Sequence, residues 1–343
     1  MPPSILILPY DRSPMHLLLM VSPHRPSERH IRMLGGLPGV TDVAVADDEA
    51  TARRAAADAD VIVGHRYLRQ SLPHAKTLEW VQSTTQGVDR LPTRKLAEKG
   101  VRLTRYTGSA ATVARHAVSL AWSVVRRIPT AVRQQRRAEW RKEMDWLPTP
   151  ESAIVFGTGS IGRSIGELLQ AHGLSVTGVK RSVDGPLPSF DRLLGSDEWR
   201  GALTDRDLCI LALPRTSETE GLLDGDALDA LPSHAVVVNV GRGETLCLGP
   251  LVERLREESL GGAALDALSE AREPLSAASP LWDVPRLTLT PHVAAYHPNR
   301  QHRVERFCEA QVRRYLDGEP LVDEVDLSTV PPTASTSSPH PEA

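Results

Sequence analysis

The chain has few aromatic residues, few cysteines and little net charge, and each shortage excludes a class of protein. Aromatic residues make up 4% of the 343 positions and the formal net charge is −3, so no basic groove for stacking nucleic-acid bases is indicated. Cys209, Cys247 and Cys308 are widely spaced and odd in number, which fits free thiols in a reducing compartment better than a disulfide framework or a zinc site. We therefore expect no nucleic-acid partner and no metal.

Long hydrophobic runs are also missing. The runs "ILIL" and "HLLLM" near the start are too short to cross a bilayer, and no basic segment with a long apolar run and a cleavage site precedes them. These absences predict a cytoplasmic protein with no membrane partner. Hydrophobic residues nevertheless make up 41% of the chain, which is enough to bury the cores of two domains.

Several common catalytic motifs are absent as well. The sequence contains no G-x-S-x-G, no G-x-x-x-x-G-K-[ST] and no Tyr followed by Lys four residues later, which argues against hydrolases, P-loop proteins and short-chain reductases. His292, His297 and His302 are spaced by fives and do not share a helical face, so they do not predict a zinc site.

Short apolar runs of β type alternate with helical patterns along the chain. The first series is "SILIL", "DVAVA", "DVIVG", "LEWVQS" and "VRLTRY", and the second is "SAIVF", "SVTGV", "LCILALP", "AVVVNV" and "LTLTPH". This alternation is typical of parallel sheets. Residues 113–143, between the two series, contain no Gly and are interrupted only by Pro129, which predicts a long helical bridge.

The predicted fold class is α/β, with two Rossmann-like parallel-sheet domains, one flavodoxin-like and one dinucleotide-binding, and an active-site cleft between them. We expect a discontinuous substrate domain at 1–112 and 298–326, and an inserted dinucleotide-binding domain at 113–297. Residues 327–343 are rich in Pro, Ser and Thr and nearly devoid of apolar side chains, so we expect a disordered tail.

The stretch "IVFGTGSIGRSIGELL" carries the clearest binding motif. Gly157, Gly159 and Gly162 form G-x-G-x-x-G between the expected strand "SAIVF" and a segment of helical spacing. In such a turn the first glycine permits a tight bend, the second lets a pyrophosphate approach, and the third lets the helix pack on the strand. The motif predicts a dinucleotide site.

The end of the next expected strand bears on the choice of cofactor. A ribose-binding carboxylate is expected about 20 residues after the glycines, but "SVTGV" is followed by Lys180, Arg181 and Ser182. Two cations and a hydroxyl attract a 2′-phosphate through charge-assisted hydrogen bonds, so NADP(H) is favoured over NAD(H). A solvated surface turn is the alternative interpretation of these three residues.

Three ionisable side chains follow other expected strands. Arg242 lies in "VVVNVGRGE", Glu273 in "SEAREPL" and His292 in "LTLTPHVAA". Ligands of open α/β sheets bind beyond the carboxyl ends of the strands, so residues from such distant loops can converge on one cofactor. Taken singly, each is equally compatible with a salt bridge, a solvated loop or a strand cap.

These motifs together resemble the D-isomer-specific 2-hydroxyacid dehydrogenases, a family that includes glyoxylate/hydroxypyruvate reductases. The resemblance covers most of residues 60–325. It depends on "WVQSTTQGVDRL", "VFGTGSIG", "LALPRTSETEGLL", "VVNVGRGE", "AALDAL" and "REPLSAASPLWDVPRLTLTPHVAA", which occur in the family's order. The last block resembles the glyoxylate/hydroxypyruvate reductase branch.

The resemblance implies a set of roles for the site residues. Arg242, Glu273 and His292 are implied as catalytic, Asp266 and Thr219 as neighbours of the nicotinamide and phosphates, and Trp140 as part of a homodimer interface. The remaining implied cofactor contacts are Ser160, Ile161, Leu213, Pro214, Val240 and Gly241. Backbone amides around Gly64, His65 and Gly87 are implied to bind a substrate carboxylate, together with Arg242.

The roles follow a simple chemistry. A guanidinium fork can hold and polarise a 2-keto acid, and an imidazolium can give a proton to the oxygen that gains charge as hydride arrives at carbon 2. A carboxylate bonded to the other ring nitrogen keeps the imidazole charged. Two residues more than the family's usual spacing separate Asp266 from Glu273, so Glu270 competes for this carboxylate role, and Arg115 stands where the family usually has Glu.

The sequence thus favours an enzyme, an NAD(P)-dependent D-2-hydroxyacid dehydrogenase that reduces a small 2-keto acid of glyoxylate or hydroxypyruvate type to the D-2-hydroxy acid, with NADP(H) favoured and NAD(H) as the other option. The alternative is a dinucleotide-sensing interaction protein that resembles the family's corepressor branch. The sequence has no evident peptide groove or basic arm that would favour this second function.

Overall fold

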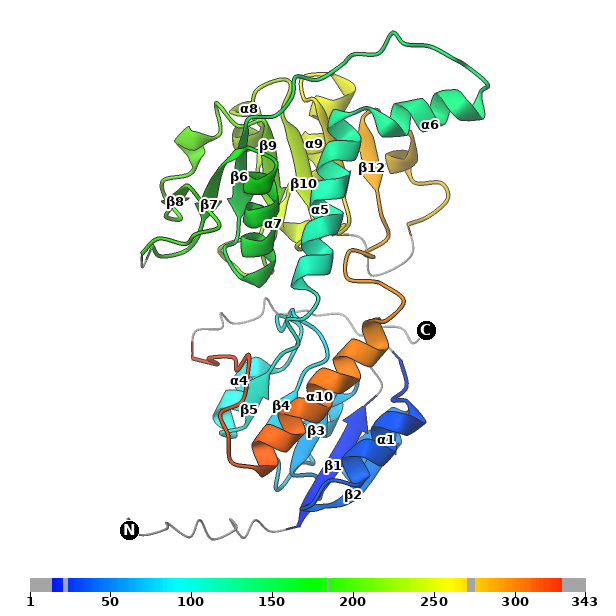
Figure 1. The fold of residues 1–343 in the computed structure, drawn as a ribbon, viewed down its shortest axis with the longest axis vertical. Helices are drawn as coiled ribbons and strands as arrows, with labels where there is room; N and C mark the ends of the chain where they lie inside the picture. The colour runs from blue at the N-terminus through cyan, green and yellow to red at the C-terminus, as the bar shows by residue number, and fades with distance from the viewer. Residues whose placement is uncertain (1–13, 21–23, 184, 270–274, 329–343) are drawn as a thin grey trace, which may run out of the picture. The chain divides into compact units, whose positions relative to one another are not determined.

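The computed structural model describes residues 14–20, 24–183, 185–269 and 275–328, and these fold into two compact units. Unit 1 holds the described residues up to Gly108 and those from His297 onward, and unit 2 runs from Ser109 to Tyr296 (Figure 1). The domain boundaries expected from the sequence fall after residues 112 and 297. The expected strand "SILIL" (4–8) and residues 329–343 of the expected tail lie outside the described residues. The start of that tail, expected at residue 327, is wrong, because Leu327 packs against the core of unit 1.

Unit 1 is built on a five-stranded parallel sheet with the order β2-β1-β3-β4-β5. This is the flavodoxin-like order, with its switch point between β1 and β3. The strands are β1 (Met15–Met20), β2 (Val40–Ala46), β3 (Val61–Val63), β4 (Trp80–Gln82) and β5 (Arg102–Thr104), and the helices are α1 (Glu28–Gly35), α2 (Glu49–Ala55), α3 (Leu68–Ser71), α4 (Thr93–Glu98) and α10 (Arg300–Leu316).

Unit 2 has a seven-stranded parallel sheet with the order β12-β11-β10-β9-β6-β7-β8. Read from β8, this is the dinucleotide-binding order with one strand added, and its switch point lies between β6 and β9. The strands are β6 (Ser152–Phe156), β7 (Ser175–Val179), β8 (Arg192–Leu194), β9 (Leu208–Leu211), β10 (Val236–Asn239), β11 (Gly262–Leu265) and β12 (Leu287–Leu289).

The helices of unit 2 are α5 (Ala110–Val125), α6 (Ile128–Arg136), α7 (Ser160–Ala171), α8 (Gly225–Asp229) and α9 (Leu248–Arg256), with short 3₁₀ turns η1 (Arg200–Ala202), η2 (Gly243–Thr245) and η3 (Pro280–Asp283). The sheet buries both faces, because alternate residues of β6 enter different cores: Val155 packs with α5 and α7, and Phe156 packs with α8 and α9. The predicted fold class of two parallel α/β sheets is confirmed.

The expected helical bridge at 113–143 is wrong in its extent and in the position of its break. Helix α5 ends at Val125, Arg127 has a left-handed φ of 53°, and α6 ends at Arg136. Pro129 lies in the first turn of α6, where its missing N–H is harmless. The break occurs at Arg127 instead, because its side chain is buried and bonded to distant carbonyl groups.

Three strands were not predicted from the sequence. The first strand was expected at 4–8, whereas β1 is formed by Met15–Met20, which contains the run "HLLLM". β8 is a three-residue edge strand, and β11 has the sequence GAAL, whose small residues have little intrinsic preference for strands. Both form because neighbouring strands pair with them. Among the described residues, no helix combines the length and the apolar composition that crossing a bilayer requires.

Candidate functional site

The glycine turn between β6 and α7 is shaped by two close contacts. Gly157 has a φ of +97°, and a Cβ built there lies 2.8 Å from the carbonyl oxygen of Ala212. A Cβ at Gly162 lies 1.7 Å from the carbonyl oxygen of Gly157. A Cβ at Gly159 meets nothing within 4 Å. The first and third glycines are therefore required by packing, whereas the second faces open space.

The open space at Gly159 lies at the start of helix α7. Gly159 is the N-cap of this 12-residue helix and has no side chain with which to cap it, and the N–H groups and positive dipole end of a helix attract anions. Ser160 begins the helix, and the partly buried Ile161 packs against the core. This cradle has the chemistry and the free space that a dinucleotide pyrophosphate needs.

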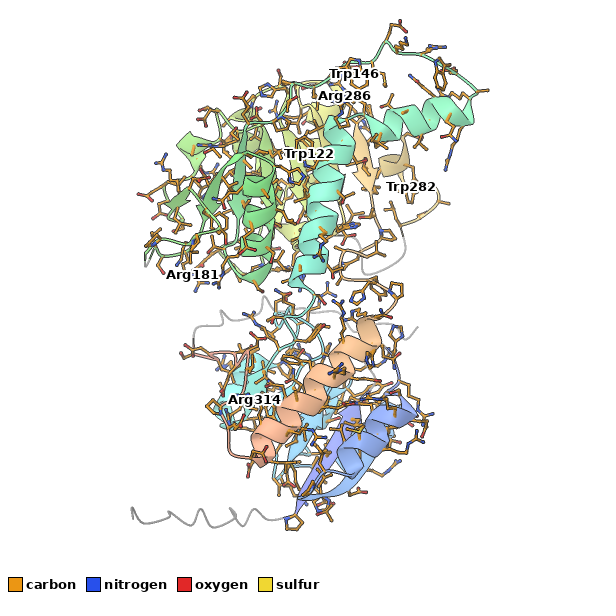
Figure 2. The ribbon with its side chains drawn as sticks, viewed as in Figure 1. Trp122, Trp146, Arg181, Trp282, Arg286 and Arg314 are labelled. Atoms are coloured by element: carbon orange, nitrogen blue, oxygen red, sulfur yellow. The ribbon has the colours of Figure 1, made fainter. Side chains whose placement is uncertain are left out.

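The predicted 2′-phosphate residues follow β7. The Lys180 N–H donates to the Leu194 carbonyl at 3.1 Å, and Ser182 is exposed. Arg181 lies at the edge of unit 2 (Figure 2), with its Nε 3.0 Å from Oε2 of Glu218. Both of these side chains are more than half exposed. Glu218 was not predicted, and it means that an incoming phosphate has to compete with a carboxylate for Arg181.

The turn that carries Arg242 is held by Asn239, the last residue of β10. The Asn239 side chain is 0% exposed, accepts the Gly241 N–H at 2.9 Å, and donates to the Arg242 carbonyl at 2.9 Å. The Thr245 hydroxyl donates to the same carbonyl at 2.7 Å. Asn239 and Thr245 were not singled out in the sequence, although an Asn two residues before a Gly is a known local turn signal.

Two glycines bring the Arg242 turn against neighbouring loops. A Cβ at Gly241 lies 2.6 Å from the carbonyl oxygen of Leu213, and a Cβ at Gly243 lies 2.1 Å from the Leu268 carbonyl carbon and from the Ser269 nitrogen. The loops that follow β9, β10 and β11 are therefore in contact at the carboxyl edge of the sheet. Glu270 directly follows Ser269 and Glu273 comes three residues later, and both lie outside the described residues.

His292 lies beyond β12 in a loop that is bonded to Asp266. The exposed His292 has a left-handed φ of 54°, and its N–H donates to the carbonyl groups of Asp266 and Thr290, each at 2.9 Å. A non-glycine residue at positive φ is uncommon and is a feature of functional sites. Asp266 itself is the first residue after β11, so the loops after β11 and β12 are joined.

The Asp266 carboxylate is 2% exposed and fully engaged with this loop. It accepts the Thr290 hydroxyl at 2.6 Å, the Val293 N–H at 2.9 Å and the Ala294 N–H at 3.0 Å. A buried carboxylate needs such donors, because an unpaired buried charge is strongly unfavourable. The resemblance implied a place beside the nicotinamide for Asp266, and the hydrogen bonds add a second task, which is to fix the backbone around His292.

His116 on α5 completes this arrangement. Its Nε2 lies 3.2 Å from the Thr290 hydroxyl and 3.4 Å from Oδ1 of Asp266. The preceding residue, Arg115, which departs from the family's usual Glu, has an exposed side chain. Nothing local distinguished His116, because its partners lie more than a hundred residues later in the chain.

The other predicted cofactor contacts also lie at the carboxyl edge of unit 2. The Thr219 hydroxyl donates to the Pro214 carbonyl at 2.7 Å and accepts the Thr216 N–H at 2.9 Å, which closes a compact turn after β9. The Val240 N–H donates to the Leu211 carbonyl at 3.0 Å. The structure therefore gathers the described cofactor and catalytic candidates of unit 2 along one edge of one sheet.

The predicted substrate-binding residues of unit 1 follow β3 and β4. Gly64 has a φ of +98°, a Cβ there lies 2.3 Å from the Met20 carbonyl oxygen, and its N–H already donates to the Gln82 carbonyl. Burial, aided by the positive charge of Arg300, lowers the pKa of His65 to about 4. The Gly87 carbonyl accepts the Thr85 hydroxyl at 3.2 Å. The Gly64 amide is thus engaged in the sheet, and the His65 ring is neutral at pH 7.

Residues 118–294 match the sequence profile of the D-isomer specific 2-hydroxyacid dehydrogenase, NAD binding domain, family. The chain is similar to glyoxylate/hydroxypyruvate reductase A of Salmonella typhimurium, with 31% identity over 220 residues, which cover 64% of this chain and 69% of the relative.

Two solved structures share the fold over nearly the whole chain. A D-isomer specific 2-hydroxyacid dehydrogenase family protein from Aeromonas salmonicida has a TM-score of 0.75 and 28% identity, and the match covers 92% of this chain and 100% of that one. A D-isomer specific 2-hydroxyacid dehydrogenase from Xanthobacter autotrophicus, solved with NADPH and MES, has a TM-score of 0.75 and 25% identity, with coverage of 91% and 98%. The chain belongs to the D-isomer specific 2-hydroxyacid dehydrogenase family.

Proposed function

We propose that the protein is an NAD(P)H-dependent reductase that converts a small 2-keto acid, of the glyoxylate or hydroxypyruvate type, to the D-2-hydroxy acid. The observation that carries this proposal is the grouping of candidate residues at the carboxyl ends of the strands of unit 2. A phosphate-binding glycine turn lies on the same edge as the loops of Arg242 and His292, and buried polar side chains, Asn239 and Asp266, fix both loops. The family and the similar reductase from Salmonella support the same reaction.

The cofactor that fits the edge is NADP(H), which supplies hydride when bound. In this proposal the open backbone at Gly159 and the start of α7 hold the pyrophosphate, and Lys180, Arg181 and Ser182 hold the 2′-phosphate. The remaining contacts come from Leu213, Pro214, Thr219, Val240, Gly241 and Asp266. The NADPH in the similar Xanthobacter structure supports this choice, and NAD(H) is the weaker candidate because β7 ends without a carboxylate.

Arg242 and His292 perform the chemistry in this proposal. The guanidinium binds the substrate through its carboxylate and carbonyl oxygens and polarises the carbonyl. The His292 imidazolium gives its proton to the carbonyl oxygen as negative charge develops there. Glu273, or Glu270 as the alternative, accepts a hydrogen bond from the other ring nitrogen and keeps the imidazole protonated near neutral pH. His65 and Gly87 remain proposed substrate-binding residues, whereas the Gly64 amide is already bonded to the Gln82 carbonyl and Gly64 is proposed only to shape the turn before His65.

We also propose a cytoplasmic homodimer. The three cysteines are free thiols, which suits a reducing compartment. Helix α6 and the segment after it expose Ile128, Val132 and Trp140, the last to 93%. Apolar side chains gathered on one exposed segment are typical of a protein–protein interface, and a second copy of the chain is the proposed partner.

An activity assay tests the function. Purified protein mixed with NADPH and glyoxylate or hydroxypyruvate is expected to consume NADPH, which is followed by its absorbance, and to form the D-isomer from substrates with a chiral product. The same assay with NADH is expected to be slower. NADPH binding without turnover across a panel of 2-keto acids would favour the dinucleotide-sensing alternative and contradict the proposed reaction.

The double variant Lys180→Asp, Arg181→Ala tests the proposed phosphate site. It is expected to change the NADPH/NADH ratio of kcat/KM by about 100-fold or more towards NADH, because two charge-assisted hydrogen bonds of about 1.5–3 kcal/mol each are lost. Glu218→Gln is the matched control, and it is expected to improve NADPH use slightly because it releases Arg181 from its ion pair. An unchanged ratio in the double variant would show that these residues do not bind the 2′-phosphate.

A further inference from the structure

Three arginines line a pocket at the amino end of the sheet of unit 2. Arg127 lies at the junction of α5 and α6, Arg133 lies on α6, and Arg286 directly precedes β12. Arg286 is drawn near the end of α5 in Figure 2. All strands of this sheet are parallel and the glycine turn follows the carboxyl end of β6, so the pocket and the proposed cofactor site are at opposite edges of the sheet.

One carboxylate, that of Asp145, forms ion pairs with two of the three guanidinium groups. Arg127 is buried, and its NH2 lies 2.8 Å from Oδ2 of Asp145. The NH2 of Arg286 lies 2.6 Å from the same oxygen, and it also pairs with Glu258 at 2.9 Å. Arg127 donates in addition to the carbonyl groups of Asp145 and Gly261. These contacts hold both guanidinium groups firmly in the wall of the pocket.

The pocket has an excess of positive charge because of the third guanidinium group, that of Arg133. Arg133 donates to the Thr130 hydroxyl at 3.0 Å, a neutral partner. Burial lowers the pKa of Arg127, and the nearby Arg286 and Arg133 lower it further, whereas Asp145 and Glu258 act in the opposite direction. Three cations thus face two carboxylates, and mutual repulsion among the cations is relieved when an anion binds.

The start of helix α6 lies at the same pocket. Arg127 is the N-cap, in a left-handed conformation, and makes no side-chain cap, and Pro129 and Thr130 of the first turn line the pocket. The uncapped N–H groups and the dipole of this nine-residue helix favour an anion there. Thr288 of β12 also lines the pocket.

We propose that this pocket binds a small oxyanion of the phosphate class. Fixed guanidinium groups and an uncapped helix start are groups that recognise a tetrahedral oxyanion. The proposal does not depend on the proposed reaction, because it uses none of its residues.

Calorimetric titration at constant ionic strength tests the proposal. The full chain, saturated with NADP⁺ so that the cofactor site is filled, is titrated with inorganic phosphate and, separately, with glycerol 3-phosphate. Binding of both indicates a phosphate-group site, and binding of inorganic phosphate alone indicates a site for the free ion. Arg133→Gln, an exposed position, is expected to weaken binding by about tenfold, the effect of losing one charge-assisted hydrogen bond.

Arg136→Gln is the matched control, since it removes an exposed arginine of the same helix that does not line the pocket. It is expected to leave phosphate binding unchanged. Equal weakening in both variants, or no binding to the wild-type protein at tens of millimolar phosphate, would overturn the proposal. The proposal would also be overturned if Arg133→Gln altered self-association in sedimentation experiments without altering phosphate binding, because the pocket would then take a carboxylate of a second copy.

Discussion

Replacing His292 by Asn is expected to lower kcat for glyoxylate reduction by about a thousandfold, the contribution expected of a well-placed general acid. Asn cannot donate a proton to the developing oxyanion as an imidazolium does. It does tolerate the left-handed backbone that His292 adopts, so the loop is expected to keep its conformation. The measurement is kcat beside the NADPH dissociation constant from cofactor fluorescence, which is expected to stay the same.

His116→Asn is the matched control for this prediction. His116 contacts Thr290 and Asp266 in the same loop, but it is proposed only to position the loop. Its replacement is expected to lower kcat by about tenfold or less and to lower the melting temperature, because the effect is loss of one or two hydrogen bonds. If the His116 variant were the inactive one and the His292 variant kept its kcat, the assignment of the proton donor would be wrong.

Replacement of Gly162 by Ala is expected to lower stability, whereas replacement of Gly159 by Ala is expected to weaken cofactor binding. Gly162→Ala is expected to lower the free energy of unfolding by about 3 kcal/mol or more, since the new Cβ would lie 1.7 Å from a backbone oxygen that cannot move away easily. Thermal unfolding of the protein without cofactor measures this loss.

Gly159→Ala is expected to leave that stability unchanged, because its Cβ meets nothing within 4 Å. It is expected to weaken NADPH binding by about tenfold or more, since a methyl group there pushes the pyrophosphate away from charge-assisted hydrogen bonds of about 1.5–3 kcal/mol. Wild-type NADPH affinity in this variant would contradict the proposed pyrophosphate site, and wild-type stability in Gly162→Ala would contradict the close packing of the turn.

The family, the fold class and the class of cofactor could be predicted from the sequence, and all three are confirmed. The glycine motif could be recognised in the sequence because its residues act through local backbone geometry. Asn239 also acts locally and left a signal, an Asn shortly before glycines, that was overlooked. The positions of the Arg242 and His292 loops could be predicted because each loop directly follows an apolar strand.

The residues that sequence reasoning missed act through contacts that are distant in the chain. His116 bonds a loop beyond residue 289, and Glu218 pairs with a cation at the end of β7. The break between α5 and α6 was misplaced for the same reason, because Arg127 is held by a carbonyl group at residue 261. The choice between Glu270 and Glu273 stays a prediction, since both lie outside the described residues.

The Asp266 carboxylate accepts a hydrogen bond from the main-chain N–H of Val293, and no hydrogen bond involves the Val293 side chain. A carboxylate that binds peptide groups imposes no requirement on the side chain at that position, and Val293 is only partly buried. Position 293 can therefore change during evolution without displacing the neighbouring imidazole. Substrate preference can then diversify through nearby side chains while the reaction itself is inherited intact.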